Sequence, residues 1–418
     1  MGIFDFLKKK TKVEQPLFYN IVCPYCFNKF QPEEVVFRAT HIQEDDGYYS
    51  AQEDEKLNRY RERLDLDELD EMEAVIEPYT IPTDKHIYSG HVLVGIVDAY
   101  GYTTKKRLCP HCHNILPITS GKSPSNIIAI VGASQVGKSV YMTSLIHTLQ
   151  NTTAANFDAA CIPINSEISR KFKQDYEEPL FERGDLLTST RKEGKQEPFI
   201  FQFKFKDDGI NPLTLVFFDI AGEGMVDQEY LDMYAAHIKN SSGMLFLVDP
   251  LQIKTIRDKI HIKRDDTIGE FASQHDEPRE VIINLFENFI GYEDNGKTKI
   301  PTAIVLTKSD MLHFLKEEDS EYIRPNSNIF NQSNHKNYFS LTEFNNINGE
   351  VKRFVEKVDR PFKDAVDVHF SDSAYFATSA LGRNPIDMQI DGIIDPIRVD
   401  EPFLWLLYKL NYIEGRED

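Results

Sequence analysis

The stretch from residue 125 to residue 149, SNIIAIVGASQVGKSVYMTSLIHTL, constrains the fold more than any other part of the chain. It contains the spacing Gly-x-x-x-x-Gly-Lys-Ser between Gly132 and Ser139. An apolar run at 127–131 precedes this spacing, and apolar residues at helical intervals follow it up to Leu149. The order of strand, glycine-containing loop and helix predicts a phosphate-binding loop at the edge of an α/β sheet.

The chemistry of such a loop assigns a role to each part of the motif. Its glycines, Gly132 and Gly137, allow the backbone N–H groups to surround a β-phosphate, and the ammonium of Lys138 reaches the β- and γ-phosphates. The hydroxyl of Ser139 is a ligand for Mg²⁺. The other residues that we expect to line the phosphates are Ser134, Gln135, Val136 and Val140. The sequence therefore predicts a nucleotide site that uses Mg²⁺.

Three more apolar runs end in polar residues. PLTLVFFDIAGEG ends its strand at Asp219, whose carboxylate can hold the Mg²⁺ shell through water, and the amide of Gly222 can meet a γ-phosphate. TAIVLTKSD and AYFATSALG supply two further candidate binding stretches, with Thr307, Lys308, Asp310, Ser379, Ala380 and Leu381. Parallel strands bring their carboxyl ends to one edge of a sheet, so we expect these groups to meet there.

The four motifs, in this order, resemble those of the Ras-like class of P-loop GTPases over roughly residues 126–382. The resemblance implies an α/β fold with a mostly parallel sheet and flanking helices, and GTP, GDP and Mg²⁺ as ligands. It also implies that Asp310 accepts hydrogen bonds from guanine N1–H and the N2 amino group. Lys308 would lie along the base and ribose, and the backbone near Ala380 would contact O6.

A narrower resemblance covers the whole chain. The stretches CPHCHNILP, GASQVGKS, DIAGEG and RVDEPFLWLLYKL are similar to bacterial zinc-ribbon GTPases of the double-GTPase type, found in GTPase-associated systems. This likeness implies a multi-protein bacterial system and protein partners.

Two departures from the Ras-like pattern concern catalysis. The stretch from Ser139 to Asp219 is about twice as long as in that class, so the magnesium-binding threonine is open between Thr190, which we favour, and Thr188. Glu223 follows Gly222 where a glutamine often orients the attacking water, and its negative charge near the γ-phosphate opposes the nucleophile. We expect slow or partner-assisted hydrolysis, with a weakly hydrolysing GTP-bound scaffold as the alternative.

Four of the five cysteines form two Cys-x-x-Cys pairs, Cys23 with Cys26 and Cys109 with Cys112. Two such turns supply the tetrahedral thiolate set that Zn²⁺ prefers, and a redox pair is the less favoured alternative. Residues 1–120 are therefore predicted as a zinc-ribbon-like domain with a charged insertion at about 43–76. Leu57, Tyr60 and Leu64 have helical spacing there, which favours a solvated helix over an acidic partner-binding surface.

The charge and the apolar runs of the chain indicate which partners and which location to expect. The formal charge of −20 makes nucleic acid an unfavoured partner. No apolar run is long enough to cross a bilayer, so we expect a cytoplasmic protein. Residues 3–10 combine apolar side chains with lysines, which leaves peripheral membrane contact as an alternative. Residues 121–418 are predicted as the GTPase domain, closed by a C-terminal apolar helix around Trp405.

Overall fold

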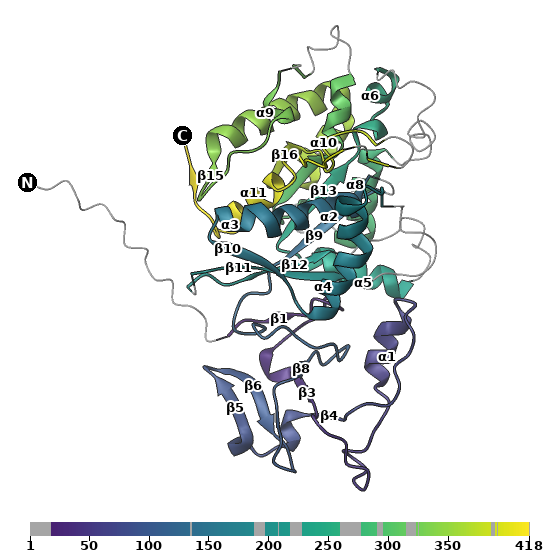
Figure 1. Ribbon diagram of the computed structural model, residues 1–418, viewed down its shortest axis with the longest axis vertical. Helices are drawn as coiled ribbons and strands as arrows, with labels where there is room; N and C mark the ends of the chain where they lie inside the picture. Colours follow the sequence, from purple (N-terminus) through teal and green to yellow (C-terminus); the bar gives the residue numbers. More distant parts are fainter. Residues whose placement is uncertain are drawn as a thin grey trace, which may run out of the picture.

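The computed structural model describes residues 18–133, 136–187, 197–207, 209–217, 228–259, 277–290, 296–314, 323–324, 326–385, 389–390 and 392–417. A sheet flanked by helices forms the larger part of the molecule, and the N-terminal part projects from one end of it (Figure 1).

The central sheet has seven strands in the order β10-β11-β12-β9-β13-β14-β16. Neighbouring strands from β12 through β16 are parallel, and β11 runs antiparallel to both β10 and β12. The strands are β9 (Ile127–Gly132), β10 (Ala159–Pro163), β11 (Phe199–Phe205), β12 (Leu213–Phe217), β13 (Gly243–Val248), β14 (Thr302–Leu306) and β16 (Ser373–Ala377). The prediction of a mostly parallel sheet is confirmed.

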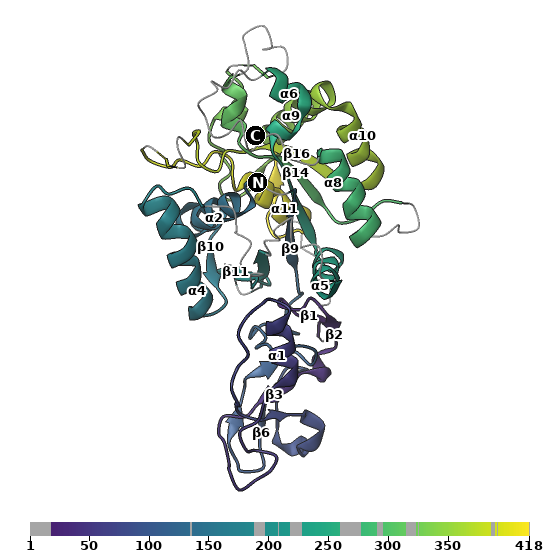
Figure 2. The same cartoon turned by 90° about the vertical axis from the view of Figure 1, so that its right-hand side faces the viewer.

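The parallel strands are apolar on both faces because helices cover both faces (Figure 2). Alternate residues divide between two cores: Ile128 and Leu245 face one, and Ala129 and Met244 face the other. The first core is covered by α2 (Lys138–Thr148), α4 (Ser166–Phe172) and α11 (Glu401–Lys409). The second is covered by α5 (Gln228–Lys239), α8 (Pro278–Leu285) and α10 (Arg360–His369), while α9 (Leu341–Val358) lies along β16. Trp405 of α11 is buried, as predicted.

Shorter elements connect these helices and strands. They are η4 (Leu149–Thr153), α3 (Ala154–Asn156), η5 (Lys173–Glu182), η6 (Pro250–Gln252), α6 (Lys254–Lys259), η7 (Phe286–Ile290), η8 (Ser309–Phe314) and η10 (Asn328–Phe330). Near the C-terminus β17 (Gly415–Arg416) pairs with β15 (Phe339–Ser340).

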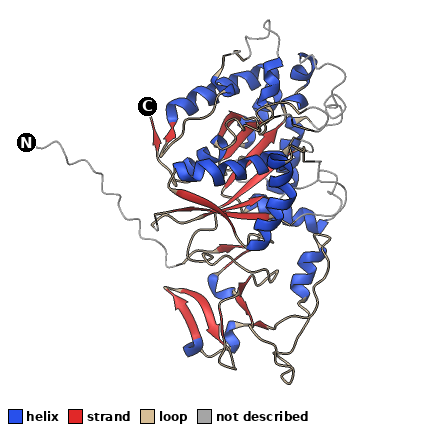
Figure 3. Ribbon diagram, in the orientation of Figure 1, coloured by secondary structure: helices blue, strands red, loops and turns tan. Residues whose placement is uncertain are grey.

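The N-terminal part consists of short strands and turns around the cysteine pairs (Figure 3). Its elements are β1 (Ile21–Val22), β2 (Lys29–Phe30), η1 (Pro32–Glu34), β3 (Val36–Arg38), α1 (Glu55–Glu62), β4 (Val75–Ile76), η2 (Pro78–Thr80), η3 (Thr83–Lys85), β5 (His86–Ser89), β6 (Val92–Val97), β7 (Thr103–Thr104) and β8 (Arg107–Leu108). The predicted helix of the insertion is α1. Tyr60 of α1 is buried against Tyr25, and Leu64 just after the helix is buried too, so this side packs on the first cysteine turn instead of being fully solvated.

Direct contacts join the N-terminal part to the sheet domain. The ring of Phe27 lies on His237 of α5, with 4.5 Å between ring centroids, and Asn240 Nδ2 donates to the Phe27 carbonyl over 3.2 Å. Complete burial lowers the pKa of His237 to about 3, so its imidazole is neutral at pH 7. Val22 N–H also donates to Ser125 Oγ. The division of the chain at residue 120 stays a prediction.

Candidate nucleotide site and cysteine centre

The glycine loop lies between the carboxyl end of β9 and the start of α2. A Cβ atom on Gly132 would lie 2.8 Å from the Leu247 carbonyl oxygen, so a larger residue there would separate β9 from β13. Gly137 has φ of +84°, a left-handed conformation that favours glycine, and it is the residue before α2. Both glycines of the motif are therefore needed for the shape of the loop. Ser134 and Gln135 lie outside the described residues.

The first turn of α2 presents the polar groups of the motif. Lys138 Nζ donates to the loop carbonyls of Gly132 (3.1 Å) and Ala133 (3.4 Å), which places the ammonium over the loop. The backbone carbonyl of Ser139 accepts a hydrogen bond from Thr143 Oγ1. A helix N-terminus carries unpaired N–H groups and a partial positive charge. This end of α2 therefore suits an anion such as a phosphate.

The Thr-Lys-Ser-Asp stretch after β14 is tied to the loop. Thr307 Oγ1 donates to the Val136 carbonyl over 3.0 Å, and Lys308 follows in a left-handed conformation with φ of +52°. Lys308 Nζ forms an ion pair with Asp249 Oδ2 at the end of β13. The other oxygen of Asp249 accepts from Leu251 N–H and so begins η6. The ends of β13 and β14 are thus connected to each other and to the glycine loop that follows β9.

Asp310 and Ser379 bring the third and fourth motifs together. Ser379 Oγ donates to Asp310 Oδ1 over 2.6 Å and accepts from Gly382 N–H. Burial raises the pKa of Asp310, an effect that the Ser379 hydrogen bond and the Lys308 charge partly offset. Ser144 of α2 donates to the Ala380 carbonyl over 2.8 Å, which fixes this loop against the phosphate-loop helix.

The structure therefore brings the first, third and fourth motifs to one edge of the sheet. Thr188, Thr190, Asp219, Gly222 and Glu223 lie outside the described residues, and their proposed roles stay predictions. Among the further residues that sequence reasoning missed, Asp249 directly follows the buried strand β13, a position that could have indicated it. Ser144 lies within a helix and carried no such signal.

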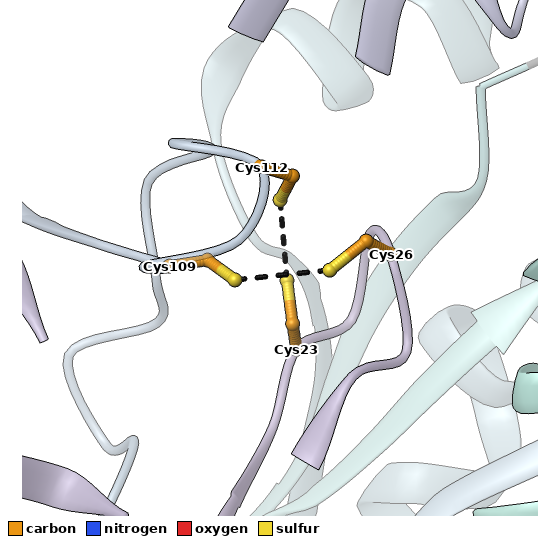
Figure 4. A group of neighbouring side chains, drawn as sticks. All are labelled: Cys23, Cys26, Cys109 and Cys112. Atoms are coloured by element: carbon orange, nitrogen blue, oxygen red, sulfur yellow. Dashed lines mark hydrogen bonds between the residues drawn. The ribbon is translucent and has the colours of Figure 1, made fainter. Parts of the chain in front are cut away.

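The four cysteine sulfurs form a compact group (Figure 4). All four Sγ atoms lie within 4.8 Å of one another, and the Cys23–Cys112 and Cys26–Cys109 Sγ distances are both 3.7 Å. Four sulfurs at about 2.3 Å from one zinc ion in a tetrahedron lie about 3.8 Å apart. The geometry therefore fits a tetrahedral metal site.

The surroundings of the sulfurs favour a metal site over exposed redox thiols. All four cysteines are buried, unlike the exposed thiols of a redox pair. The Asn28 and Asn114 side-chain amides donate to Cys26 and Cys112 sulfurs, as donors beside metal thiolates do.

His113, the residue after Cys112, pairs with an aspartate. His113 Nδ1 lies 2.7 Å from Asp54 Oδ1, and Arg38 binds the other oxygen of Asp54. Cys161 lies in the sheet domain instead, where burial raises its thiol pKa to about 12.

The α/β sheet carries a glycine loop at its strand ends, and hydrogen bonds hold the aspartate of the third motif and the Ser-Ala-Leu loop of the fourth beside it. These features define a P-loop nucleotide-binding protein. Comparison with protein families gives the particular group: residues 129–338, about half of the chain, match the Double-GTPase 1 family model, and the chain belongs to this family. Membership supports GTP binding.

Individual relatives are more distant. The chain is 26% identical over 322 residues to "Putative ESX-1 scaffolding and assembly protein SaeC" of Mycolicibacterium smegmatis, which covers 72% of this chain and 78% of that protein. Among solved structures, the Arl6 BBS3 small GTPase of Trypanosoma brucei with bound GppNp is 12% identical with a TM-score of 0.28, covering 69% of this chain and 99% of that one. A "putative nucleolar GTP-binding protein 1" of Plasmodium falciparum is 13% identical with a TM-score of 0.27, covering 69% and 89%. At these TM-scores the two structures carry no argument here.

Across the described residues, no helix is long and apolar enough to cross a membrane.

Proposed function

We propose that this protein is a Mg²⁺-dependent switch that binds GTP and hydrolyses it to GDP and phosphate within a multi-protein bacterial system. One observation carries the proposal: the phosphate loop, Asp310 and the Ser379–Ala380 loop are held together by the Thr307–Val136, Ser379–Asp310 and Ser144–Ala380 hydrogen bonds. These contacts join a phosphate-binding element to a carboxylate suited to guanine. The family match supports the same conclusion.

Base recognition in this proposal rests on Asp310. Guanine presents two donors, N1–H and the N2 amino group, to a carboxylate, whereas adenine lacks both on that edge. An ionised carboxylate in a largely buried position discriminates strongly between the bases. Its oxygens lose their hydration when a base binds, and this cost is offset only when both donors are present. Lys308 would lie along the base and ribose, held in place by Asp249.

The metal ions have separate roles. Mg²⁺ would be held by the Ser139 hydroxyl, by Thr190 and, through water, by Asp219, and it would neutralise charge on the β- and γ-phosphates. Zn²⁺ would be held by the four cysteines and would stabilise the fold of the N-terminal part.

We propose Glu223 as the residue that contacts the attacking water, with the slow or partner-assisted turnover that its charge implies.

A second candidate is a GTP-bound scaffold that hydrolyses its nucleotide very slowly. The name of the Mycolicibacterium smegmatis relative, a scaffolding and assembly protein, favours this alternative, as does the glutamate at 223. Both candidates bind GTP, so turnover and its dependence on partners separate them. A cytoplasmic location stays a prediction.

The test compares GTP binding and steady-state phosphate release, with and without the products of neighbouring genes. Lys138→Ala should abolish nucleotide binding, because Lys138 meets charges that are present before reaction. Glu223→Ala should keep binding and change turnover, because Glu223 acts only through the attacking water. Lys352→Ala, a half-exposed lysine of α9 that pairs with Asp367, is the matched control and should change neither.

Binding of GTP with no turnover under every partner condition would establish the scaffold and overturn the switch. Failure of the wild-type protein to bind GTP would overturn both.

A further inference from the structure

A group of tyrosines lies on two loops of the N-terminal part, away from the nucleotide site. We define the tyrosine cluster as Tyr48, Tyr49, Tyr100 and Tyr102. Tyr49 contacts both Tyr48 and Tyr100, with ring centroids 5.1 Å and 5.2 Å apart, and His41 joins Tyr102 to the group through a 4.4 Å contact. Tyr48, Tyr100 and Tyr102 keep 43%, 45% and 54% of their surface exposed. The cluster is therefore a continuous aromatic surface rather than scattered residues.

Carboxylates fix the shape of the cluster. Asp98 Oδ1 accepts from the backbone N–H groups of Tyr100 and Tyr102, both over 2.9 Å. Asp46 accepts from Tyr48 N–H over 2.8 Å and from the Tyr100 hydroxyl over 2.6 Å. These bonds fix the backbone of both loops and the ring of Tyr100, so the surface loses little conformational entropy when a partner binds, which is a property of interface anchors.

Acidic side chains lie around Tyr48 and Tyr49. Glu44 and Asp45 are exposed on the same loop, and residues 41–55 contain no lysine or arginine. On the other loop the Lys85 ammonium donates to the Asp98 carbonyl over 3.5 Å. The acidic loop repels phosphates, which argues against nucleic acid and anionic lipid as its ligands. It attracts guanidinium groups in two ways, through the tyrosine faces and through ion pairs at the rim.

We propose that the tyrosine cluster is a docking surface for an arginine-rich segment of a partner protein. Arginine side chains stack on the exposed rings of Tyr100 and Tyr102, and neighbouring arginines pair with Glu44 and Asp45. This site is independent of the nucleotide, because its residues belong to loops of the N-terminal part and contain none of the nucleotide motifs.

The test uses the full chain and three fluorescent twelve-residue peptides: alternating Arg-Ser, alternating Lys-Ser and alternating Glu-Ser. Anisotropy titrations at physiological salt should show that the Arg-Ser peptide binds about fivefold or more tightly than the Lys-Ser peptide, which is the size of a cation–π preference of about 1 kcal/mol. The Glu-Ser peptide should not bind.

Tyr102→Ala leaves the net charge unchanged and keeps the backbone contact to Asp98, so it isolates the ring. It should remove the preference for arginine, whereas Tyr102→Phe should keep it. Tyr79, 84% exposed on η2 and outside the cluster, supplies the matched control: Tyr79→Ala should bind as the wild type does. Equal metal content and melting temperature establish that the variants fold.

Two results would overturn the proposal. Equal binding of the arginine and lysine peptides, unchanged in Tyr102→Ala, would mean that only the overall charge of the protein attracts them. The second concerns the chain's own basic residues, Lys8, Lys9, Lys10 and Lys12. If deletion of residues 2–12 strengthens peptide binding tenfold or more, this segment already occupies the surface and no separate partner is needed.

Discussion

Replacing Asp310 by asparagine tests the proposed guanine site most directly. Ser379 Oγ donates to Asp310 Oδ1 over 2.6 Å, and an asparagine can keep this bond through its own carbonyl oxygen. The amide NH₂ then replaces the acceptor that would face guanine. Loss of a charge-assisted hydrogen bond costs about 1.5–3 kcal/mol, and a donor left facing a donor adds about 1–3 kcal/mol. A total of about 2.5–6 kcal/mol weakens GTP binding by roughly 70- to 25,000-fold.

Competition binding with GTP, XTP and ATP measures this effect. XTP carries a carbonyl oxygen where guanine has its N2 amino group, so Asp310→Asn should gain relative affinity for XTP. Ser379→Ala is the control, since it loses one hydrogen bond but keeps the carboxylate. It should weaken GTP binding about tenfold or less and leave the preference for GTP over XTP intact. An Asp310→Asn protein with unaltered base preference would refute the assignment, because the phosphate loop is the same in both proteins.

The same substitution has a second consequence in nucleotide-free protein. Burial raises the pKa of Asp310, so the folded state binds its proton more tightly than the unfolded state does. This contribution to stability is complete below the ordinary carboxyl pKa and is lost as pH rises through the raised one. Above that pH the ionised Asp310 costs stability, and Asp310→Asn should melt at a higher temperature than the wild type. The difference should disappear at acid pH, and its persistence there would contradict the linkage.

Three other perturbations address the rest of the molecule. We expect one zinc per chain by elemental analysis, with loss of both the metal and the N-terminal fold in Cys109→Ser; a metal-free wild type with an unchanged melting temperature would exclude the site. Asp249→Asn keeps the acceptor for η6 but removes the ion pair to half-exposed Lys308, and it should weaken GTP and GDP binding equally, about three- to fivefold. A selective loss of GTP would mean that Asp249 acts on the γ-phosphate. Phe27→Ala should lower the free energy of unfolding by about 3–5 kcal/mol in denaturant titrations, because Phe27 is fully buried against His237; a cost under about 1 kcal/mol would contradict this packing.

The sequence predicts the strand ends well because each motif depends on a local pattern. A buried strand followed by glycine, lysine or aspartate is visible in a few residues, and β9, β12 and β14 are confirmed on that basis. The same is true of α1, whose apolar residues Leu57 and Tyr60 recur at helical spacing. Local patterns therefore suffice where the functional residue belongs to the element that reveals it.

The structure departs from prediction where a contact joins distant parts of the chain. The strand β13 lies between β9 and β14, yet its sequence contains no binding motif and was not singled out. Asp249 acquires its importance only from Lys308, far away in the chain. The edge strand β10 likewise belongs to an insertion whose place in the sheet depends on pairing with β11. Such positions follow from tertiary packing, which no short window of sequence contains.

Helix α5 connects the two predicted sites physically. The chain enters it from the segment that contains Asp219 and Glu223, and its last turn holds His237 against Phe27, the residue after Cys26. A helix transmits displacement along its length, because its backbone hydrogen bonds resist bending. A nucleotide that moves the start of α5 must therefore move its contact with the cysteine turn, or break it. Under the proposed function, hydrogen exchange at the Phe27 turn should differ between the GTP-bound and GDP-bound protein. Phe27→Ala should remove that difference while leaving nucleotide affinity within about twofold, and an identical exchange pattern in both nucleotide states of the wild type would show that α5 is only a structural support.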